Sequence, residues 1–209
     1  MCRRMANRSY RDEQWGNRYS PHIKPVNELV DLIIRDDLNR WVPYVAPSYG
    51  GVNAELLNVL QDPGPKTLQG TGSGFISQEN DDPTAERLCD FMESANISPS
   101  RAMLWNAYPW YINRRPKASD LKDGIKPLMK LLDLRPCLKV VMLNGLVAQN
   151  LWRMVEREHA TLTQQFRFVV ISTFHTSNRA MVKTTNRDHV QAAFAHAGRI
   201  LGEDNTAAG

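Results

Sequence analysis

The fold is decided by residues 56–66, which read LLNVLQDPGPK. A short apolar run, interrupted only by Asn58, is typical of a buried β-strand, and a carboxylate and two prolines follow it directly. Each proline fixes its own backbone φ angle, so the segment that carries Asp62 is expected to be rigid. Asp62 is therefore a candidate functional group held at the end of the strand. The alternative is an ordinary turn residue whose charge solvates that strand end.

The same pattern returns further along the chain. Each predicted strand is followed by a helix with an apolar stripe, and Asp82 and Ser119 are the expected N-caps of the first two helices. The three further strands are predicted within residues 101–107, 138–143 and 166–173. Four strand–helix repeats predict an α/β fold, with three α/β/α layers around a central, mostly parallel four-stranded sheet.

The chain has 209 residues, a length that suits one domain with an extension. Residues 1–25 show no helical or strand period and are rich in Arg, Asn, Ser and Tyr, which predicts a flexible basic arm. Residues 26–203 are the predicted domain, which begins with a helix inside residues 26–41, and residues 204–209 are a predicted tail.

Composition excludes several classes of protein. No apolar run approaches the roughly 18 residues that a membrane span needs. The arginines near the N-terminus are not followed by the apolar segment that a signal peptide has. A cytoplasmic protein without membrane contact, and a monomer, is expected. Cys2, Cys89 and Cys137 are odd in number and widely spaced, which fits neither a disulfide framework nor a four-cysteine metal site. Reduced cysteines, no metal and no cofactor are expected.

The net charge of +4 is mild, but its distribution is uneven. Residues 111–139 hold eight basic and three acidic side chains, and the first 24 residues hold six basic and two acidic side chains. Such runs are typical of phosphate-binding surfaces and equally of solvated helix faces.

Polar residues follow the predicted strands at the point where each strand ends. They are Gln61 and Asp62, Asn106, Asn144, and His175. Parallel strands joined by right-handed crossovers end at one edge of the sheet, and ligands bind along that edge in open α/β folds. We expect these side chains to converge on one cleft, although polar strand ends also occur without any function.

Four short segments resemble motifs of the uracil-DNA glycosylase superfamily, in the order that the superfamily has them. The resemblance covers about residues 42–201, and the absence of a four-cysteine set disfavours the iron–sulfur branches. The best-known branch has GQDPY in the first motif and HPS in the last. The segments here are VLQDPGP (59–65), SGFIS (73–77), LWNAYPW (104–110) and FHTSNRA (174–180).

The resemblance implies a role for each strand-end residue. Asp62 would orient the attacking water and stabilise positive charge on the deoxyribose, and His175 would donate to the uracil O2 as the base leaves. Asn106 would pair with N3 and O4 of uracil, and Gln61 would contact the substrate. Read without the resemblance, each is an ordinary polar residue at the end of a strand.

Two further positions concern the base itself. Phe75 would stack on the extruded base, although a lone Phe is more often part of a core. Gly64 stands where the best-known branch has a Tyr that excludes the thymine methyl group, so a broader range of bases is expected. Leu60 and Thr176 also replace the usual Gly and Pro.

DNA is the partner that the resemblance implies. Ser177 would bind a phosphate or only stabilise its turn, and Arg179 would fill the gap left by the flipped base or contact phosphate. Arg114, Arg115 and Lys117, in the loop after the second strand, would follow the DNA backbone.

The expected activity is hydrolytic removal of uracil, and of related damaged bases, from DNA in base-excision repair. No Lys is expected in the cleft in a position to form a Schiff base, so a monofunctional glycosylase that leaves an abasic site is predicted. The alternative is a catalytically silent protein of the same fold that binds uracil-containing or single-stranded DNA. A different α/β hydrolase is disfavoured, because no phosphate loop or GxSxG elbow is found.

Overall fold

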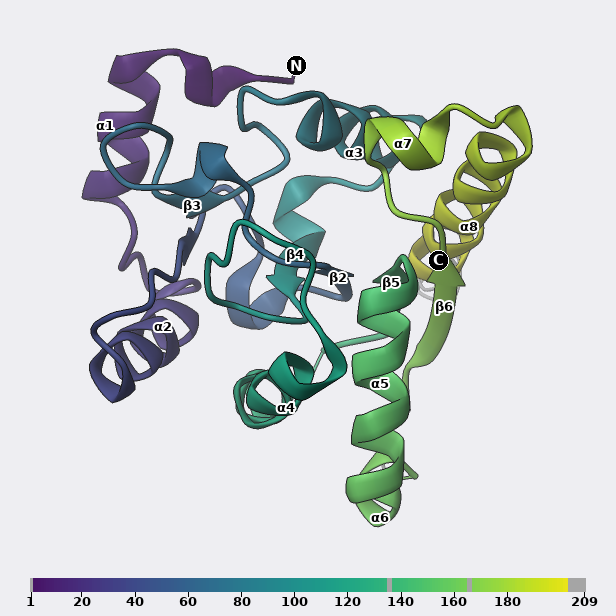
Figure 1. The fold of residues 1–209 in the computed structure, drawn as a ribbon. Coiled ribbons are helices and arrows are strands. Elements are labelled where there is room, and N and C mark those ends of the chain that lie inside the picture. Colours follow the sequence, from purple (N-terminus) through teal and green to yellow (C-terminus); the bar gives the residue numbers. More distant parts are fainter. Residues whose placement is uncertain (1, 135–136, 165–166, 203–209) are drawn as a thin grey trace, which may run out of the picture.

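The computed structural model describes residues 2–134, 137–164 and 167–202, so the expected tail, residues 204–209, lies outside the described residues. A sheet of four strands in the order β4-β2-β5-β6 forms the centre (Figure 1). All of its neighbouring strands are parallel, as predicted. The strands are β2 (Leu56–Leu60), β4 (Ala102–Asn106), β5 (Val140–Asn144) and β6 (Val169–Thr173).

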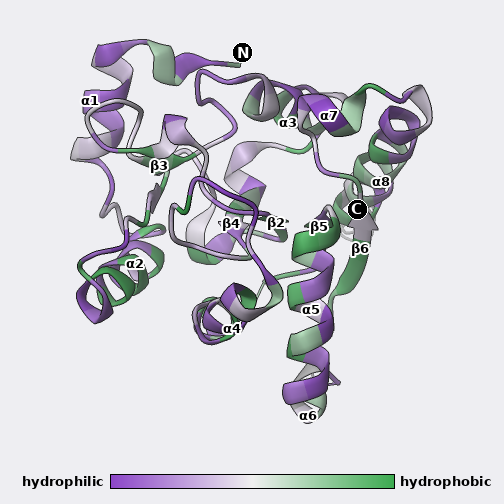
Figure 2. Cartoon of the chain, viewed as in Figure 1, coloured by the Kyte–Doolittle hydropathy of each residue, from purple (hydrophilic) through white to green (hydrophobic). Residues whose placement is uncertain are grey.

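Helices cover both faces of this sheet, which confirms the three-layer α/β/α architecture. Helix α4 packs against α5, and α3 packs against α8; Figure 1 shows the two pairs on opposite sides of the strands. Their bounds are α3 (Pro83–Ser94), α4 (Ala118–Asp133), α5 (Leu146–Glu158) and α8 (Thr184–Gly202). Figure 2 shows hydrophobic and hydrophilic residues on different sides of α5, as one buried face requires.

The helix starts follow local capping chemistry. The Asp82 carboxylate accepts hydrogen bonds from the backbone N–H groups of Thr84 (2.9 Å) and Ala85 (3.0 Å), so α3 begins as predicted. Helix α4 instead begins at Ala118, one residue before the expected N-cap Ser119, because the Asp120 carboxylate accepts from the N–H of Lys117 at 2.7 Å.

Several smaller elements complete the fold. Helix α2 (Lys24–Asp36) forms where a helix was predicted and packs against α4. Strands β1 (Tyr44–Val45) and β3 (Phe75–Ile76) form a two-stranded parallel sheet that was not predicted. None of the described helices is both long and apolar enough to cross a membrane. The short helical segments are η2 (Gly51–Asn53), η3 (Pro65–Thr67), η4 (Pro99–Arg101), α6 (Ala160–Thr163) and α7 (Asn178–Met181).

The prediction of an unstructured N-terminal arm is wrong for residues 4–16. They form η1 (Arg4–Ala6) and α1 (Arg8–Gly16). The Trp15 ring lies 5.0 Å from the Phe75 ring, and its indole N–H donates to the carbonyl of Ser73 at 3.1 Å. Few apolar residues make this contact, so the sequence shows no periodicity there although the segment is packed against the core.

The expectation of three reduced cysteines is also wrong. Cys2 and Cys89 form a disulfide between the N-terminal segment and α3, with Cα atoms 6.0 Å apart, and Cys137 is free and exposed. The two cysteines are 87 residues apart, so their pairing depends on tertiary structure that spacing alone does not reveal.

Candidate active site

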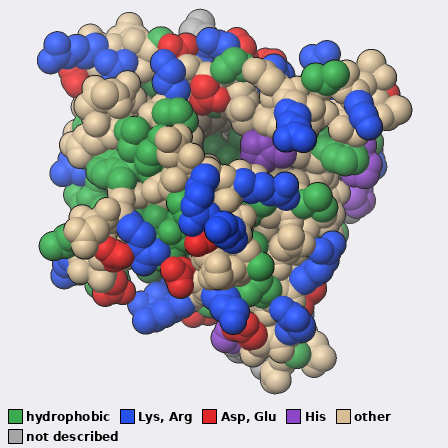
Figure 3. Space-filling model, in the orientation of Figure 1, with side chains coloured by type: hydrophobic (Ala, Val, Ile, Leu, Met, Phe, Trp, Pro, Cys, Tyr) green, Lys and Arg blue, Asp and Glu red, His purple; other side chains and the backbone are tan. Residues whose placement is uncertain are grey.

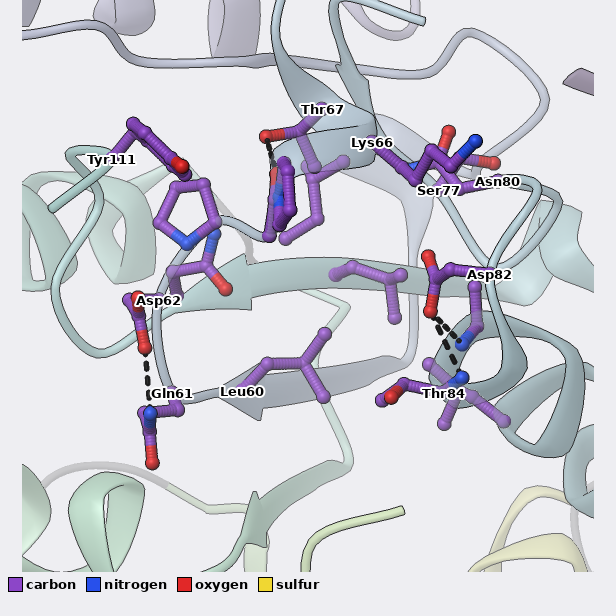
Figure 4. Close-up of a pocket in the computed structure, with 18 of the residues that line it drawn as sticks. Leu60, Gln61, Asp62, Lys66, Thr67, Ser77, Asn80, Asp82, Thr84 and Tyr111 are labelled. Carbon is purple, nitrogen blue, oxygen red and sulfur yellow. Dashed lines mark hydrogen bonds between the residues drawn. The ribbon is translucent and has the colours of Figure 1, made fainter. Parts of the chain in front are cut away.

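A cavity of about 540 Å³ opens at the carboxyl ends of β2 and β4, and it is seen as a hollow in Figure 3. Its volume falls within the roughly 300–1,000 Å³ of typical ligand sites. Figure 4 shows Gln61 and Asp62 at one end of the cavity, and Asp82 and Thr84 at the other. Most of the wall comes from residues 60–67, 76–88 and 106–114 and from His175 and Thr176.

Asp62 is held by the rigid segment that follows β2. Pro65 begins η3, and the next residues close the turn because the Thr67 hydroxyl and backbone N–H both donate to the carbonyl of Gly64, at 2.8 and 3.0 Å. Gln61 Nε2 donates to Asp62 Oδ1 at 2.7 Å. The backbone and one carboxylate oxygen are therefore fixed, and the residue lines the cavity as predicted.

Burial raises the pKa of the Asp62 carboxyl to about 6, while the hydrogen bond from Gln61 and the positive charge of Arg114 oppose that rise. A carboxyl with this pKa is mostly ionised at pH 7 and can still accept a proton in a slightly acidic medium. Such a group is suited to general-base chemistry.

Asn106 is the last residue of β4, and its backbone is paired with that of Leu60. The strand ends are tied together beyond this pair, since the N–H of Ala107 donates to Leu60 O (2.8 Å) and that of Tyr108 to Gln61 O (3.0 Å). These bonds place the Asn106 side chain, which is largely buried and lines the cavity, beside the segment that carries Asp62.

His175 enters the same cavity from the end of β6. The backbone N–H of Ser177 donates to His175 Nδ1 at 3.1 Å, which makes Nδ1 an acceptor and leaves the proton of a neutral ring on Nε2. Burial lowers the pKa of the imidazole, and the nearby Asp82 carboxylate acts in the opposite direction. The backbone and Cβ of His175 lie close to Gly145, where an added Cβ would lie 3.0 Å from His175 Cβ.

Phe75 does not line the cavity, so the predicted contact with a base is wrong at this residue. Its side chain is fully buried against Trp15, and the next residue, Ile76, lines the cavity instead. The pairing of β3 with β1 explains this, because successive side chains in a strand point to opposite faces. Asn144 is also absent from the wall: its amide donates weakly to Asn58, Val59 and Met142 inside the sheet.

Gly64 lies on the cavity wall, and a Cβ placed there would meet no atom within 4 Å. Its φ of −80° is open to any residue. The wall at this point is therefore open space, as expected if this position leaves room for larger bases.

Of the residues predicted to contact DNA, Arg114 is the one in the described wall of the cavity. It forms a two-point ion pair with Asp120, at 2.6 and 3.1 Å. Arg115 and Lys117 are exposed on the same loop, and Arg179 is exposed on α7. Lys and Arg side chains gather beside the hollow in Figure 3. Ser177 precedes α7 outside the cavity wall, and its backbone rather than its hydroxyl contacts His175.

The wall includes residues that the sequence analysis did not predict, and Lys66 and Tyr111 are two of those that carry polar groups. Lys66 lines the cavity, and its ammonium lies 3.6 Å from the Asp81 carboxylate. Tyr111 lines it near Asp62 (Figure 4). Both lie a few residues beyond a strand end, on turns whose course only the fold shows.

Comparison with known proteins agrees with this geometry. No match to the chain was found among curated proteins. The family model described as the uracil DNA glycosylase superfamily matches residues 47–198, more than half of the chain and all four motif segments. The chain therefore belongs to the uracil DNA glycosylase superfamily.

Proposed function

We propose that this protein removes uracil from DNA by hydrolysing the N-glycosidic bond and leaving an abasic site. The observation that carries the proposal is the meeting of Asp62, Asn106 and His175 in one cavity, although they come from three different strand ends. A carboxylate, an amide and a neutral imidazole are the groups that this hydrolysis uses.

In the proposed reaction, the bond between C1′ and the base nitrogen breaks and its electron pair leaves with the base. The ionised Asp62 carboxylate stabilises the positive charge on the sugar and orients a water molecule toward C1′. The water oxygen bonds to C1′ and its proton passes to the carboxylate. The hydrogen bond from Gln61 goes to Oδ1. No donor among the described residues reaches Oδ2, which is the oxygen that would bind this water.

His175 acts on the departing base. Its Nε2–H is the donor left over when Nδ1 accepts from Ser177, and the lowered pKa keeps the ring neutral. A neutral Nε2–H donor at the uracil O2 stabilises the negative charge that develops on the departing base.

Asn106 discriminates between uracil and cytosine. Its amide offers an acceptor to the N3–H of uracil and a donor to O4, a pair that cytosine mismatches. A mispaired buried amide costs about 1–3 kcal/mol, which is enough for selection.

DNA binding in this proposal is electrostatic around the opening. Arg114, Arg115 and Lys117 follow the backbone on one side, and Ser177 and Arg179 contact the strand near the flipped nucleotide. The exposed positions of Arg115, Lys117 and Arg179 support this role.

The test uses oligonucleotides that carry one uracil, presented as single strands, U:G pairs and U:A pairs, followed by alkali to cleave abasic sites. We expect cleavage at the uracil and none in a matched thymine oligonucleotide. Omitting the alkali should leave the strand intact, because a monofunctional enzyme does not cut the backbone. No cleavage on any of the three uracil substrates would overturn the proposal.

A further inference from the structure

Tyr111 carries the one benzene ring among the described residues that line the cavity. It is partly exposed, and in Figure 4 it lies at the same end of the cavity as Asp62, with its hydroxyl end directed inward. The neighbouring wall includes the aliphatic side chains of Leu60 and Leu104. A flat aromatic surface thus stands beside the proposed reacting carboxylate.

The side chain of Tyr111 is free, in contrast to the other tyrosines of the chain. The hydroxyls of the other five form hydrogen bonds with protein groups: Tyr10 with Glu79, Tyr19 and Tyr44 with Asp31, Tyr49 with the N–H of Gln78, and Tyr108 with Arg40. Within the described residues, the hydroxyl of Tyr111 has no such partner, and its ring contacts no other aromatic ring.

The backbone beneath the ring is nevertheless fixed. The N–H of Tyr111 donates to the carbonyl of Trp41 at 2.8 Å. The preceding residues Tyr108 and Trp110 are buried and pack against each other, and the guanidinium of Arg40 lies 4.0 Å from the Trp110 ring centre. A ring that stands on a fixed backbone, and that has no hydrogen-bond or aromatic partner among the described residues, is available to a ligand.

We propose that Tyr111 stacks on the extruded base and so takes the role for which Phe75 is not placed. The inference rests on the proposed function, since it concerns the base that this site would excise. A flipped base offers a flat π surface to whichever ring the pocket supplies. The tyrosine ring contributes through its face, so the hydroxyl is dispensable.

The test compares Tyr111→Phe, which keeps the ring, with Tyr111→Leu, which keeps apolar bulk without it. Excision of uracil is measured under single-turnover conditions. Binding of a uracil-containing and a uracil-free oligonucleotide is measured in the Asp62→Asn background, which holds the substrate intact. Stacking of one base typically contributes about 5- to 150-fold in affinity. We therefore expect Tyr111→Leu to lose about tenfold or more of the preference for uracil-containing DNA, and Tyr111→Phe to keep it.

The outcomes separate the two proposals. Inactive wild-type protein would refute uracil excision itself. Active wild-type protein, with an unchanged preference in Tyr111→Leu, would overturn the stacking role alone. Equal losses in Tyr111→Phe and Tyr111→Leu would also overturn it, because the hydroxyl would then be the group that matters. Thermal unfolding of each variant shows whether a loss comes from misfolding, and Tyr111→Met replaces Tyr111→Leu if the latter does not fold.

Discussion

At the scale of single residues, Asp62 shows the conflict between burial and charge. The proposed reaction needs an ionised carboxylate beside C1′, yet burial raises the pKa of the Asp62 carboxyl to about 6. Gln61 and Arg114 limit the rise. At neutral pH the proposed base is therefore only about one pH unit above the point at which half of it is protonated.

The pH profile of the reaction should report this pKa. The ionised carboxylate is the proposed active form, so single-turnover rates should be level above pH 7 and fall by about tenfold for each pH unit below pH 6. The measurement is excision of uracil between pH 4.5 and 8.5, with unfolding followed over the same range. A flat profile down to pH 4.5 in folded protein would contradict the role of Asp62.

The same residue should lower the stability of the fold at neutral pH. A carboxyl whose pKa is higher in the folded than in the unfolded state stabilises the fold below about pH 4, and this contribution is lost as the pH rises through about 6. Asp62→Asn removes the buried charge and should raise Tm relative to wild type at pH 8, but by less at pH 4. An equal change in Tm at both values would show that charge is not the cause.

Gly64 is the residue at which we expect a substitution to alter the range of bases without disturbing the fold. A Cβ there meets nothing, so Gly64→Ala and Gly64→Val should unfold within about 2 °C of wild type and fill cavity space. Activity on 5-substituted uracils should fall more than activity on uracil. Gly16→Ala, which also meets open space but lies on α1, is the matched control. An unchanged ratio of the two activities in Gly64→Val would remove Gly64 from the base pocket.

At the scale of elements, the N-terminal segment supports one wall of the cavity. Glu79 is buried and forms an ion pair with Arg4, accepts from the Tyr10 hydroxyl at 2.6 Å, and its carbonyl accepts from the N–H of Met5. Its neighbour Asn80 lines the cavity. The segment lies outside the region that matches the superfamily, yet it holds the loop that leads from β3 into α3.

The disulfide is the covalent part of this attachment. A crosslink across a long stretch of chain typically stabilises a fold by about 2–4 kcal/mol, which corresponds to a fall in Tm of roughly 5–15 °C on reduction. Cys2→Ser should show the same fall and no further response to reductant. Thiol titration of denatured protein should give one free thiol before reduction and three after it. Three free thiols in unreduced protein would contradict the pairing.

At the scale of the whole molecule, the sheet and its functional edge could be predicted from the sequence. Strands β2, β4 and β5 are buried apolar runs, whereas the edge strand β6 is largely exposed. Asp62, Asn106 and His175 lie at or just beyond the ends of β2, β4 and β6, so their convergence is a consequence of parallel topology. Phe75 could not be placed in this way. It belongs to a two-residue strand whose pairing with β1 turns its side chain to the core.

Long-range contacts explain the other differences between prediction and structure. Residues 4–16 form helices because Trp15 and Met5 pack against the core. The pairing of Cys2 with Cys89 depends on the position of α3 in the fold. Tyr111 lies five positions beyond the strand-end residue Asn106, on a loop whose path is set by a hydrogen bond to Trp41. Local sequence carries no signal for any of these contacts.

The most direct test of the central claim is single-turnover excision from a uracil-containing oligonucleotide by wild type, Asp62→Asn and Asp12→Asn. Asp12 is an exposed carboxylate on α1 and controls for the loss of one charge. We expect Asp62→Asn to fold, to bind the oligonucleotide and to lose about 100-fold or more of the rate, with Asp12→Asn unchanged. Undiminished excision by folded Asp62→Asn would contradict the account.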